Sequence, residues 1–547
     1  MSRFLLSGVF LLIITSISNA QDTSRPKSID ITSTFKPVLR ESAKINFNAN
    51  PPVVDTTRPR LTYNIPSQNL FFAYQPAELK PVALDVDSVV AWQYSNFIKA
   101  GIGNVHQPFI KAGFSFGDGK STFFNLFANH YTSKGSRPYQ KNSLTSVGAA
   151  ASYLTPKHHE WNGRIGFVSD DYFLYGYKPD SLEFTKEQLR QRFQTIEGKI
   201  DFRNTIPTEY GLSWHPSLRV SVMKDNKALQ GSESNTVLDL PLEKTFGQSF
   251  AFNLGATAML TNYQRSNTAT KITLQNNLYY ISAAVLFKTP NLFIHGGLRP
   301  SWDARKFKML PNIMADITTN DQRFTFQLGW IGYYNKGSYQ RFASINPWLA
   351  QPDSIFNTRV DERYAGFKGS VGSHFTYSAK VGFQQYRNMP LFVNDSGDGK
   401  TFLLRYEPRL EALQVHGEVA YSKGEQLSLT AALNFNQFTN LDKEHRAWGL
   451  LPLEFNAGVR WQLMKDLWLR SDLWAFDGAQ YLGKDGQAYK GETGFDLSAG
   501  AEFRINKNFN LWVQFNNIMN NRYERWHQYE VFGFNLLGGI TYSFNQK

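Results

Sequence analysis

Side chains alternate in character with a period of two through most of this chain, from Asn96 to Phe544. Successive side chains of a β-strand point to opposite faces, and the alternating segments are rich in aromatic and β-branched residues. The pattern is clear at 109–116, 427–438, 495–505 and 511–515. In the last segment one face carries Leu536, Gly538, Ile540, Tyr542 and Phe544, and the other carries Leu537, Gly539, Thr541 and Ser543. The chain is therefore predicted to consist mainly of β-strands.

Ten short turn signals divide this pattern, and their centres lie 31 to 52 residues apart. They occupy residues 117–119, 155–158, 206–209, 247–248, 289–291, 320–321, 372–373, 423–425, 464–466 and 506–508. Between neighbouring turns we expect two strands and a longer, more polar loop, for example 132–142, 178–190, 389–400 and 478–492. Short turns at one end and long loops at the other are typical of an outer-membrane barrel.

The ten turns separate eleven strand–loop–strand units. They predict an all-β fold, a transmembrane antiparallel β-barrel of about 22 strands, with even counts from about 16 to 22 still open. Residues 96–544 provide roughly 20 residues per strand and connection, enough for a tilted strand of about 9–11 residues. A soluble propeller is the alternative, but a blade of about 40 residues holds four strands, and only two fit each period here.

The composition agrees with a barrel. Aromatic residues make up 15% of the chain, which suits aromatic girdles at the two membrane interfaces. The mean hydropathy of −0.39 suits strands that face lipid on one side and water on the other.

The N-terminus has the pattern of a secretory signal peptide. Met1–Ala20 carries a basic residue at Arg3, an apolar stretch over 4–17 and a small-x-small sequence that ends at Ala20. A single membrane anchor is the alternative, but the apolar run is shorter than the roughly 20 residues of a membrane span. We expect residues 1–20 to direct export to the outer membrane.

Residues 21–95 differ in composition from the alternating region. Eight prolines lie between residues 21 and 92. Proline removes a backbone donor and biases the preceding residue towards extended backbone. We expect 21–95 to be an extended, Pro-rich segment in the periplasm or the lumen, followed by the barrel over 96–547.

The chain contains no cysteine, which excludes a disulfide scaffold, a thiolate zinc site, an iron–sulfur cluster and a cysteine nucleophile. No set of serine, histidine and acidic residues gathers at one rim, as a hydrolase would need. We predict that the protein is not an enzyme and has no catalytic residue, no metal and no cofactor. The ligand-binding residues are unknown at this level.

Two glycine motifs match chemical sites only in form. Residues 113–121 resemble a phosphate loop, but five residues separate the outer glycines and a strand follows instead of a helix. Gly113, Ser115 and Gly117 match a nucleophile elbow, yet Ser115 alternates inside a strand. A hairpin turn is expected here.

Three acidic or histidine-containing stretches are weak candidates for metal binding. Residues 394–399 carry the oxygen ligands of a calcium loop without the glutamate at its twelfth position, so a solvated turn is preferred. One long loop holds Asp477, Asp485 and Glu492. His158–Glu160 is expected at a short turn, and no second histidine follows at helical spacing.

The formal net charge is +13, and two interpretations stay open. Inward-facing basic residues would favour anionic solutes in the lumen. Alternatively, basic residues of the loops and rim would bind acidic lipopolysaccharide: Lys134, Arg137, Lys141, Lys186, Arg190 and Arg192. Nucleic acid is not an expected partner of an exported barrel.

Six loop aromatics are candidates for stacking on a sugar or a hydrophobic ligand: Tyr172, Phe173, Tyr175, Tyr177, Trp348 and Trp448. Membership of the interfacial girdle is the preferred explanation for them.

Three stretches resemble known barrels. Residues 515–523 and the last strand, 533–544, resemble the end of TonB-dependent outer-membrane receptors, which often close with an Asn-hydrophobic-x-Asn/Asp-x-x-Tyr stretch, a glycine-containing strand and an aromatic end. Asn346-Pro347-Trp348-Leu349, with Glu362 and Gly366 after it, is similar to the step that precedes a barrel strand in the same family. Segments 35–39 and 44–47 look similar to plug-poor barrels of the Bacteroidetes type.

The chain departs from the family before the barrel. Only about 75 mature residues precede the first strand, and they contain none of the arginine–glycine motifs of a folded plug domain. Ser28–Thr32 is a candidate TonB box. A barrel of 22 strands without a plug leaves a wide hole, so the Pro-rich segment, inward loops or a partner subunit should fill it.

The resemblance implies a Gram-negative outer-membrane barrel that takes part in the uptake of a solute. The alternative is a non-transporting barrel that anchors or assembles an envelope or cell-surface complex. Expected partners are outer-membrane lipid and lipopolysaccharide, the barrel assembly machinery through the C-terminal strand ending at Phe544, and either TonB or a separate plug or periplasmic subunit.

Overall fold

The structure, a computed structural model, describes residues 95–545 apart from 119, 267–268 and 270. The predicted signal peptide, the Pro-rich segment and the candidate TonB box lie outside these residues, so these predictions and the domain boundaries drawn from them stay predictions. Two short helices occur among the described residues, α2 (Lys186–Leu189) and α3 (Tyr339–Ile345). No helix in this part of the chain is long and apolar enough to cross a membrane.

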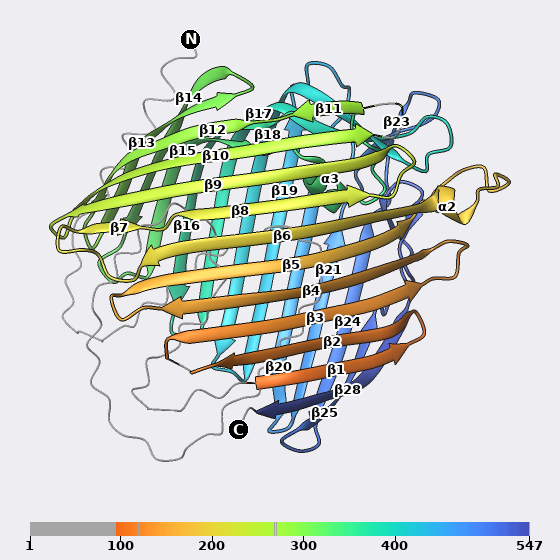
Figure 1. The fold of residues 1–547 in the computed structure, drawn as a ribbon, viewed down its shortest axis with the longest axis horizontal. Coiled ribbons are helices and arrows are strands. Elements are labelled where there is room, and N and C mark those ends of the chain that lie inside the picture. Colours follow the sequence, from red (N-terminus) through yellow and green to blue (C-terminus); the bar gives the residue numbers. More distant parts are fainter. Residues whose placement is uncertain (1–94, 119, 267–268, 270, 546–547) are drawn as a thin grey trace, which may run out of the picture. The chain divides into compact units, whose positions relative to one another are not determined.

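Antiparallel strands form one closed sheet. The strand β1 (Ser95–Gly103) pairs with both β2 (His106–Gly117) and β28 (Asn535–Asn545), which joins the first strand to the last (Figure 1). The strands between them are β3 (Thr122–Lys134), β4 (Lys141–Leu154), β5 (His159–Phe173), β6 (Arg190–Asn204), β7 (Leu212–Trp214), β8 (Ser217–Asp225), β9 (Gln230–Phe246), β10 (Phe250–Ser266), β11 (Lys271–Gln275), β12 (Leu278–Lys288), β13 (Leu292–Asp303), β14 (Lys306–Thr318), β15 (Phe324–Asn335), β16 (Thr358–Val371), β17 (Phe375–Asn394), β18 (Phe402–Lys423), β19 (Leu427–Thr439), β20 (Leu453–Met464), β21 (Leu467–Phe476), β24 (Gly494–Arg504) and β25 (Phe509–Asn516).

Twenty-two of these strands make the wall. The short segment β7 pairs with β9, as β8 does, and β11 pairs with β10, as β12 does. Each therefore continues the line of an existing strand and adds no strand to the wall. Two further hairpins belong to loops and not to the wall: β22 (Gln480–Leu482) with β23 (Ala488–Lys490), and β26 (Glu524–Trp526) with β27 (Tyr529–Glu530). The predicted all-β barrel of about 22 strands is confirmed.

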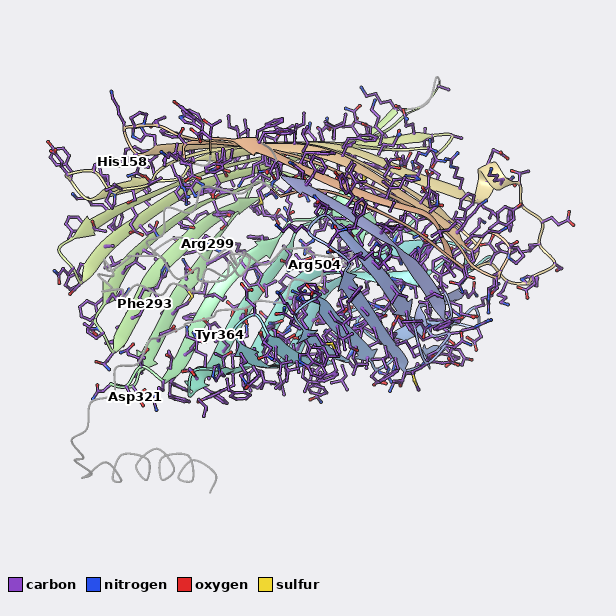
Figure 2. All side chains as sticks on the ribbon, turned by 90° about the horizontal axis from the view of Figure 1, so that it is seen from below. His158, Phe293, Arg299, Asp321, Tyr364 and Arg504 are labelled. Atoms are coloured by element: carbon purple, nitrogen blue, oxygen red, sulfur yellow. The ribbon has the colours of Figure 1, made fainter. Side chains whose placement is uncertain are left out.

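The ten predicted turns all join neighbouring strands of the wall, from the β2–β3 turn to the β24–β25 turn. Figure 2 shows His158 and Asp321, which belong to two different turns, at the same end of the barrel. Gly247, Gly372 and Gly424 have positive φ in three of the turns, a conformation that favours glycine. Turn chemistry is local, which explains why the sequence revealed these positions.

The connections at the opposite end are less uniform than expected. The predicted loop 389–400 is wrong in extent, because β17 and β18 continue to pair as far as Asn394 with Phe402. Strands β13 and β14 are joined by only Ala304 and Arg305, both with positive φ, which gives a tight hairpin. We call this the long-loop end because its other loops include 336–357 and 517–534.

The two faces of each strand differ as the alternation predicts. Along β10, Phe250, Phe252 and Leu254 are exposed, while Ala251 and Thr257 on the opposite face are buried. The last strand follows the same rule, since Leu536, Ile540 and Tyr542 are exposed and Leu537 and Thr541 are buried. The exposed face is therefore the outer, apolar face of the barrel.

The inner face is polar and its charges are mostly paired. Lys368 contacts Asp316 at 3.2 Å and Lys199 contacts Asp201 at 3.0 Å. Not every cation has an opposite charge in register, since Lys99 of β1 lies directly across from Lys111 of β2. A polar inner wall is what a water-facing lumen requires.

A charge placed on the outer face should destabilise the barrel. We expect Leu254→Arg to lower the free energy of unfolding in lipid by about 2–4 kcal/mol, because the arginine would face the bilayer near the middle of its apolar band. Asn253→Arg, one residue away on the inner face, is the matched control and should have a small effect. Equal losses, measured by denaturant unfolding in lipid vesicles, would contradict the assignment of the two faces.

Candidate functional site

The loop between β15 and β16, residues 336–357, contains α3 and lies at the long-loop end. Ser338 caps the helix, since its hydroxyl accepts a hydrogen bond from the Arg341 N–H. The helix ends at Ile345, where Pro347 biases Asn346 towards extended backbone. We call residues 336–357 the α3 loop.

Buried polar groups attach the α3 loop to the inner wall. The carboxylate of Glu233 on β9 is fully buried and accepts hydrogen bonds from the Tyr339 N–H at 2.6 Å and the Gln340 N–H at 3.0 Å. The Tyr339 hydroxyl donates to Asp225 on β8 at 3.2 Å. The Glu233 carboxylate thus satisfies backbone groups that the first turn of a helix leaves unpaired, and Asp225 holds the Tyr339 side chain.

Apolar packing reinforces this attachment. The ring centroid of Tyr339 lies 5.8 Å from that of Phe193 on β6 and 5.3 Å from that of Tyr263 on β10. Phe342 is buried in the same cluster. The helix therefore covers the inner face of β6, β8 and β10.

The segment after the helix contacts both β6 and the end of the β17–β18 hairpin. Gln191 of β6 donates to the carbonyl oxygens of Pro347 and Leu349 at 2.5 and 3.0 Å. On the other side, the Phe402 N–H of β18 donates to the Trp348 carbonyl at 3.1 Å, and the Ala350 N–H donates to the Phe402 carbonyl at 2.8 Å. Phe402 lies in the end of the β17–β18 hairpin, where these two strands pair only with each other, beyond their pairing with β16 and β19. Residues 347–350 thus join β6 to this hairpin end at the mouth.

A second loop, 517–534, meets the first at a pair of stacked rings. Trp348 and Tyr529 of β27 have ring centroids 3.9 Å apart and planes at 22°. Trp526 of β26 packs edge-on against Phe392 and Phe402, with centroids 5.1 and 5.4 Å away. These residues belong to one cluster, the mouth cluster, whose buried members are Phe193, Met223, Tyr263, Tyr339, Phe342, Ala343, Leu349, Ile355, Phe392, Phe402, Trp526 and Tyr529.

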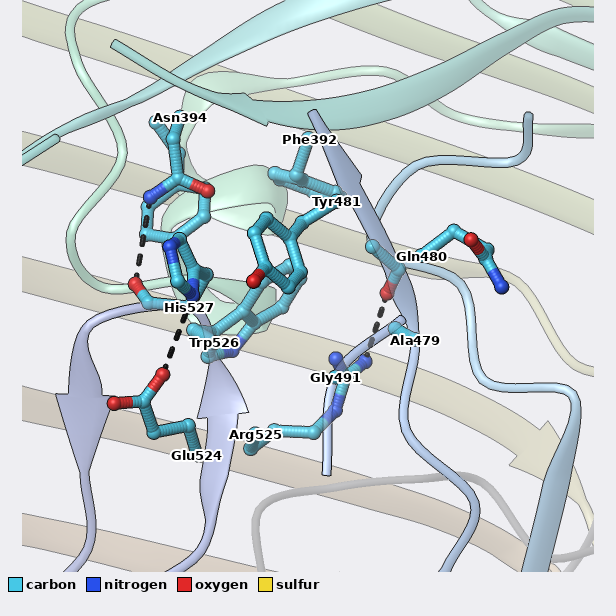
Figure 3. Close-up of a pocket in the computed structure, with 12 residues that line it drawn as sticks. Phe392, Asn394, Ala479, Gln480, Tyr481, Gly491, Glu524, Arg525, Trp526 and His527 are labelled. Atoms are coloured by element: carbon cyan, nitrogen blue, oxygen red, sulfur yellow. Dashed lines mark hydrogen bonds and ion pairs between the residues drawn. The ribbon is translucent and has the colours of Figure 1, made fainter. Parts of the chain in front are cut away.

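A pocket lies beside the mouth cluster, between the β26–β27 hairpin and the loops after β19 and β21 (Figure 3). The empty space of about 360 Å³ at this site includes open solvent. The ring of Tyr481 stacks on that of His527 at 3.7 Å, and Nδ1 of His527 lies 3.3 Å from a carboxylate oxygen of Glu524. The lining residues are Phe392, Asn394, Phe402, Gly449, Ala479, Gln480, Tyr481, Gly491, Glu524, Arg525, Trp526 and His527.

Two polar atoms of the pocket lining are left unsatisfied. The Arg525 guanidinium lies over the Trp526 ring at 4.2 Å and donates from Nη2 to the Gly449 carbonyl at 3.2 Å. Its Nη1 is buried with no partner among the described residues, and so is Oδ1 of Asn394. Burial lowers the pKa of Arg525 to about 10, against the attraction of Glu454.

Glu524 stays ionised in this setting. Burial raises its pKa, but the hydrogen bonds from His527 and from the Gln528 N–H outweigh burial and leave the pKa below the usual value. A carboxylate held in this way orients the His527 ring beneath Tyr481. The arrangement can bind polar groups, and no nucleophile–base pair accompanies it among the residues that line the pocket.

Lys336 makes the stability of the α3 loop depend on pH. Its ammonium donates to the Asn276 carbonyl, and burial lowers its pKa to about 8 against the attraction of Asp303 and Glu233. The folded pKa lies below the ordinary lysine value of 10.5, so the unfolded loop binds more protons between these two values and folded stability rises with pH across that window.

We expect the amide protection factors of residues 337–345, measured by hydrogen exchange, to rise from pH 8 to pH 10. Lys336→Met should remove that rise, because it leaves no proton to release. A rise that persists in the methionine variant would contradict Lys336 as its source.

The six aromatics taken as girdle residues are placed differently by the structure. Trp448 and Phe173 are buried in apolar clusters at the long-loop end, and Trp348, Tyr172 and Tyr175 pack on the mouth cluster. The girdle interpretation is wrong for these residues, because their strand ends and loops pack side chains against one another at the mouth instead of against lipid. Tyr177 likewise packs against the cluster that contains Phe173.

Most of the basic loop residues have partners within the protein. Arg190 and Arg192 both contact Asp171, at 2.9 and 2.8 Å, and Arg137 pairs with Glu530. The Lys141 ammonium lies 4.6 Å from the centroid of the Phe173 ring. Lys134 and Lys186 are exposed. The loop cations thus hold the loops together in part, and lipopolysaccharide binding by them stays a prediction.

The acidic residues named above as weak metal candidates bind other side chains and do not gather around a common point. Asp477 pairs with Lys490 at 2.7 Å, whereas Asp485 accepts hydrogen bonds from Tyr489 and the Gln487 N–H. Asp398, in the calcium-like stretch, pairs with Lys400. Among the described residues no group of three or more His, Asp or Glu side chains could hold a metal ion.

The glycine motifs lie in strand β2 and the turn that follows it. Gly113, Ser115 and Gly117 belong to β2, and the carboxylate of Asp118 accepts hydrogen bonds from the N–H groups of Ser121 and Thr122, both at 2.8 Å. His158 has positive φ in the β4–β5 turn, as expected for a short turn. The hairpin interpretation is confirmed for both stretches.

Sequence reasoning missed Glu233, Gln191 and Arg525. A signal existed for α3 itself, since Tyr339, Phe342 and Ala343 have the i, i+3, i+4 spacing of an apolar helix face. No spacing could have linked Gln191 to residues 347–349, because the contact spans about 156 residues of chain.

No protein-family model and no curated protein matches the chain. Solved structures match its fold. The FrpB iron transporter of Neisseria meningitidis has a TM-score of 0.65 over 83% of this chain and 82% of that chain, at 9% identity. A ferric enterobactin receptor mutant of Pseudomonas aeruginosa, in complex with enterobactin, gives 0.63 over 83% and 81%, at 10% identity. The siderophore receptor PirA of the same species gives 0.57 over 83% and 80%, at 12% identity.

The chain has the barrel fold of these receptors. The resemblance to TonB-dependent outer-membrane receptors, drawn from the C-terminal strand and the Asn346–Leu349 step, is thus confirmed at the level of fold. The Asn346–Leu349 step does precede a barrel strand, β16. These neighbours are receptors and transporters rather than enzymes, in agreement with the expectation for this chain. The Bacteroidetes type and the reduced plug stay predictions.

Proposed function

We propose that this protein takes part in the uptake of a solute across the outer membrane, in the manner of a TonB-dependent receptor. The observation that carries the proposal is the closed barrel of 22 strands, with an apolar outer face and a polar inner face, in the fold of siderophore and iron receptors. A pocket with unsatisfied polar groups at the long-loop end supports ligand capture there. By the usual arrangement of such barrels, this end faces outwards and the short turns face the periplasm.

The partners follow from this placement. Outer-membrane lipid and lipopolysaccharide would surround the apolar face, and the barrel assembly machinery would recognise the strand that ends near Phe544. TonB, or a separate plug or periplasmic subunit, would act from the short-turn end. The predicted signal peptide supports export to the outer membrane.

Heat-modifiable gel migration tests the barrel. The unheated chain should migrate differently from the heated chain, and soluble recovery from the periplasm with no shift would overturn the proposal.

Planar-bilayer conductance tests transport. The full chain is compared with chains in which residues 21–92, the α3 loop, or both are replaced. A conducting state in any of them supports a transport path. Zero conductance in all, with folded barrels, would contradict it.

One observation favours the second candidate, a non-transporting barrel that anchors or assembles an envelope complex. Residues 347–350 join β6 to the end of the β17–β18 hairpin at the mouth, and a barrel that transports nothing would lose no function through this obstruction. This candidate predicts zero conductance in all four chains and co-purification of envelope proteins that is lost when residues 21–92 are deleted.

A further inference from the structure

Loops of the barrel meet at its described mouth. We propose that the α3 loop is a built-in gate: it occludes the long-loop end, and a solute enters only when this loop releases the inner wall and the end of the β17–β18 hairpin. The inference goes beyond solute uptake, because it assigns to the barrel itself a closing role at this end.

The attachments of the α3 loop are spread around the barrel. Glu233 binds it from β9 and Gln191 from β6. The indole N–H of Trp348 donates to the Phe173 carbonyl of β5 at 3.1 Å, and Phe402 binds it from β18. A loop tied to one strand would leave the rest of the mouth open, whereas these ties join β5, β6 and β9 to the end of the β17–β18 hairpin, which extends beyond the pairing of these strands with β16 and β19.

A polar clasp secures the two ends of the same loop. Asn276 and Asn357 exchange two amide hydrogen bonds, each of 2.9 Å, and both side chains are buried. Asn276 also donates to the Gly337 carbonyl at 2.9 Å. Because Gly337 and Asn357 lie at the loop's start and end, the clasp fixes the base from which the helix projects into the lumen (Figure 1).

The contacts described for the α3 loop are non-covalent, so they can be released. Five buried polar atoms around the mouth have no partner among the described residues: Gln191 Oε1, Tyr263 Oη, Asn346 Nδ2, Asn394 Oδ1 and Arg525 Nη1. A buried donor or acceptor without a partner is costly, and water would satisfy it when the loop opens. The chain has no cysteine with which to lock the loop covalently, and a seven-residue helix is not stable by itself.

The absence of native cysteine allows a direct test of access in the full chain. Met259→Cys places a single thiol on the inner face of β10, four residues from Tyr263, which contacts α3. Intact cells that display the full chain are treated with a membrane-impermeant maleimide, and the labelling rate is measured. In one variant a short Gly-Ser linker replaces residues 339–354. Asn335 and Thr358 are paired neighbours, so the linker can join the strands.

The matched control replaces residues 179–184 of the β5–β6 loop with the same linker. We expect the thiol to label slowly in the Met259→Cys chain and in the control, and at least about tenfold faster when residues 339–354 are replaced, a factor that corresponds to a modest change in opening free energy. Fast labelling of the Met259→Cys chain, slow labelling after the α3 loop is replaced, or an equal rise in the control would each overturn the proposal.

The migration of the unheated protein on a gel shows whether the variant with the 339–354 replacement folds. If it does not fold, two point variants still test the proposal. Glu233→Ala removes one anchor of α3, and Glu243→Ala removes a buried carboxylate on the same face of β9 that is remote from the loop. The first should raise the labelling rate and the second should not. Labelling reports only whether the thiol can be reached from outside. The gate can therefore be confirmed when solute uptake is not, and solute uptake can be confirmed when the gate is not.

Discussion

Replacing Glu233 by alanine is expected to loosen the α3 helix from the barrel wall. The carboxylate is fully buried and accepts the N–H groups of Tyr339 and Gln340. Without it, two buried donors lose their acceptor, and each unsatisfied group costs about 1–3 kcal/mol. Amide hydrogen exchange of residues 339–343 should therefore accelerate by about 30-fold or more, since about 1.4 kcal/mol corresponds to a factor of ten.

Two further variants separate this anchor from general loosening. Glu233→Gln keeps an acceptor oxygen and should give a smaller acceleration. Glu243→Ala is the matched control, because Glu243 is buried on the same strand face, ten residues nearer the short-turn end. If exchange of the helix accelerates as much in the control, the anchor role of Glu233 is wrong.

Replacing Trp348 by alanine should have the largest effect on the mouth. Its ring stacks on Tyr529 with centroids 3.9 Å apart and packs edge-on against Tyr172 and Tyr175. Its indole N–H also donates to the Phe173 carbonyl. Removing a large packed aromatic ring costs about 3–5 kcal/mol, and here the cost falls on the junction of two loops. Tryptic cleavage within the α3 loop, after Lys336 or Arg341, should become fast while the barrel still shows heat-modifiable migration.

Trp348→Phe should lose only the hydrogen bond, about 1 kcal/mol, because a phenyl ring can still stack on Tyr529. Trp461→Ala is the control. Trp461 is 41% exposed on the outer face of β20 and does not touch the mouth cluster. Equal cleavage rates in the Trp348→Ala and Trp461→Ala chains would show that the stack does not hold the mouth.

The positions of the turns were open to prediction because their causes are local. Pro290 lies in one of these turns, and Gly372 and Gly424 adopt positive φ in two others, a conformation that does not depend on distant residues. The extent of the longest strands was not predictable in this way. β17 and β18 run as far as Asn394 and Phe402 because they pair with each other, although Pro390 lies within β17.

The candidate site was predictable only in part. The Asn346–Leu349 step was recognised as lying before a strand, and the loop aromatics were recognised as a set. Their roles were misjudged, because an aromatic side chain near a strand end can face lipid or the mouth, and the sequence pattern is the same for both. The polar anchors Glu233 and Asn357 gave no signal, since a single carboxylate or amide in a barrel strand or loop is ordinary.

The sequence alone determined that this protein is a two-faced barrel of about 22 strands. Side-chain alternation and turn chemistry are properties of neighbouring residues, and repeated along the chain they fix the number of strands and which face each residue takes. Only the tertiary structure decided that loops meet at the mouth. That meeting depends on contacts such as Gln191 with Leu349 and Leu349 with Phe402. These contacts exist because the closed sheet brings the α3 loop and the end of the β17–β18 hairpin to β6, and no local pattern encodes the distances between these three parts of the chain.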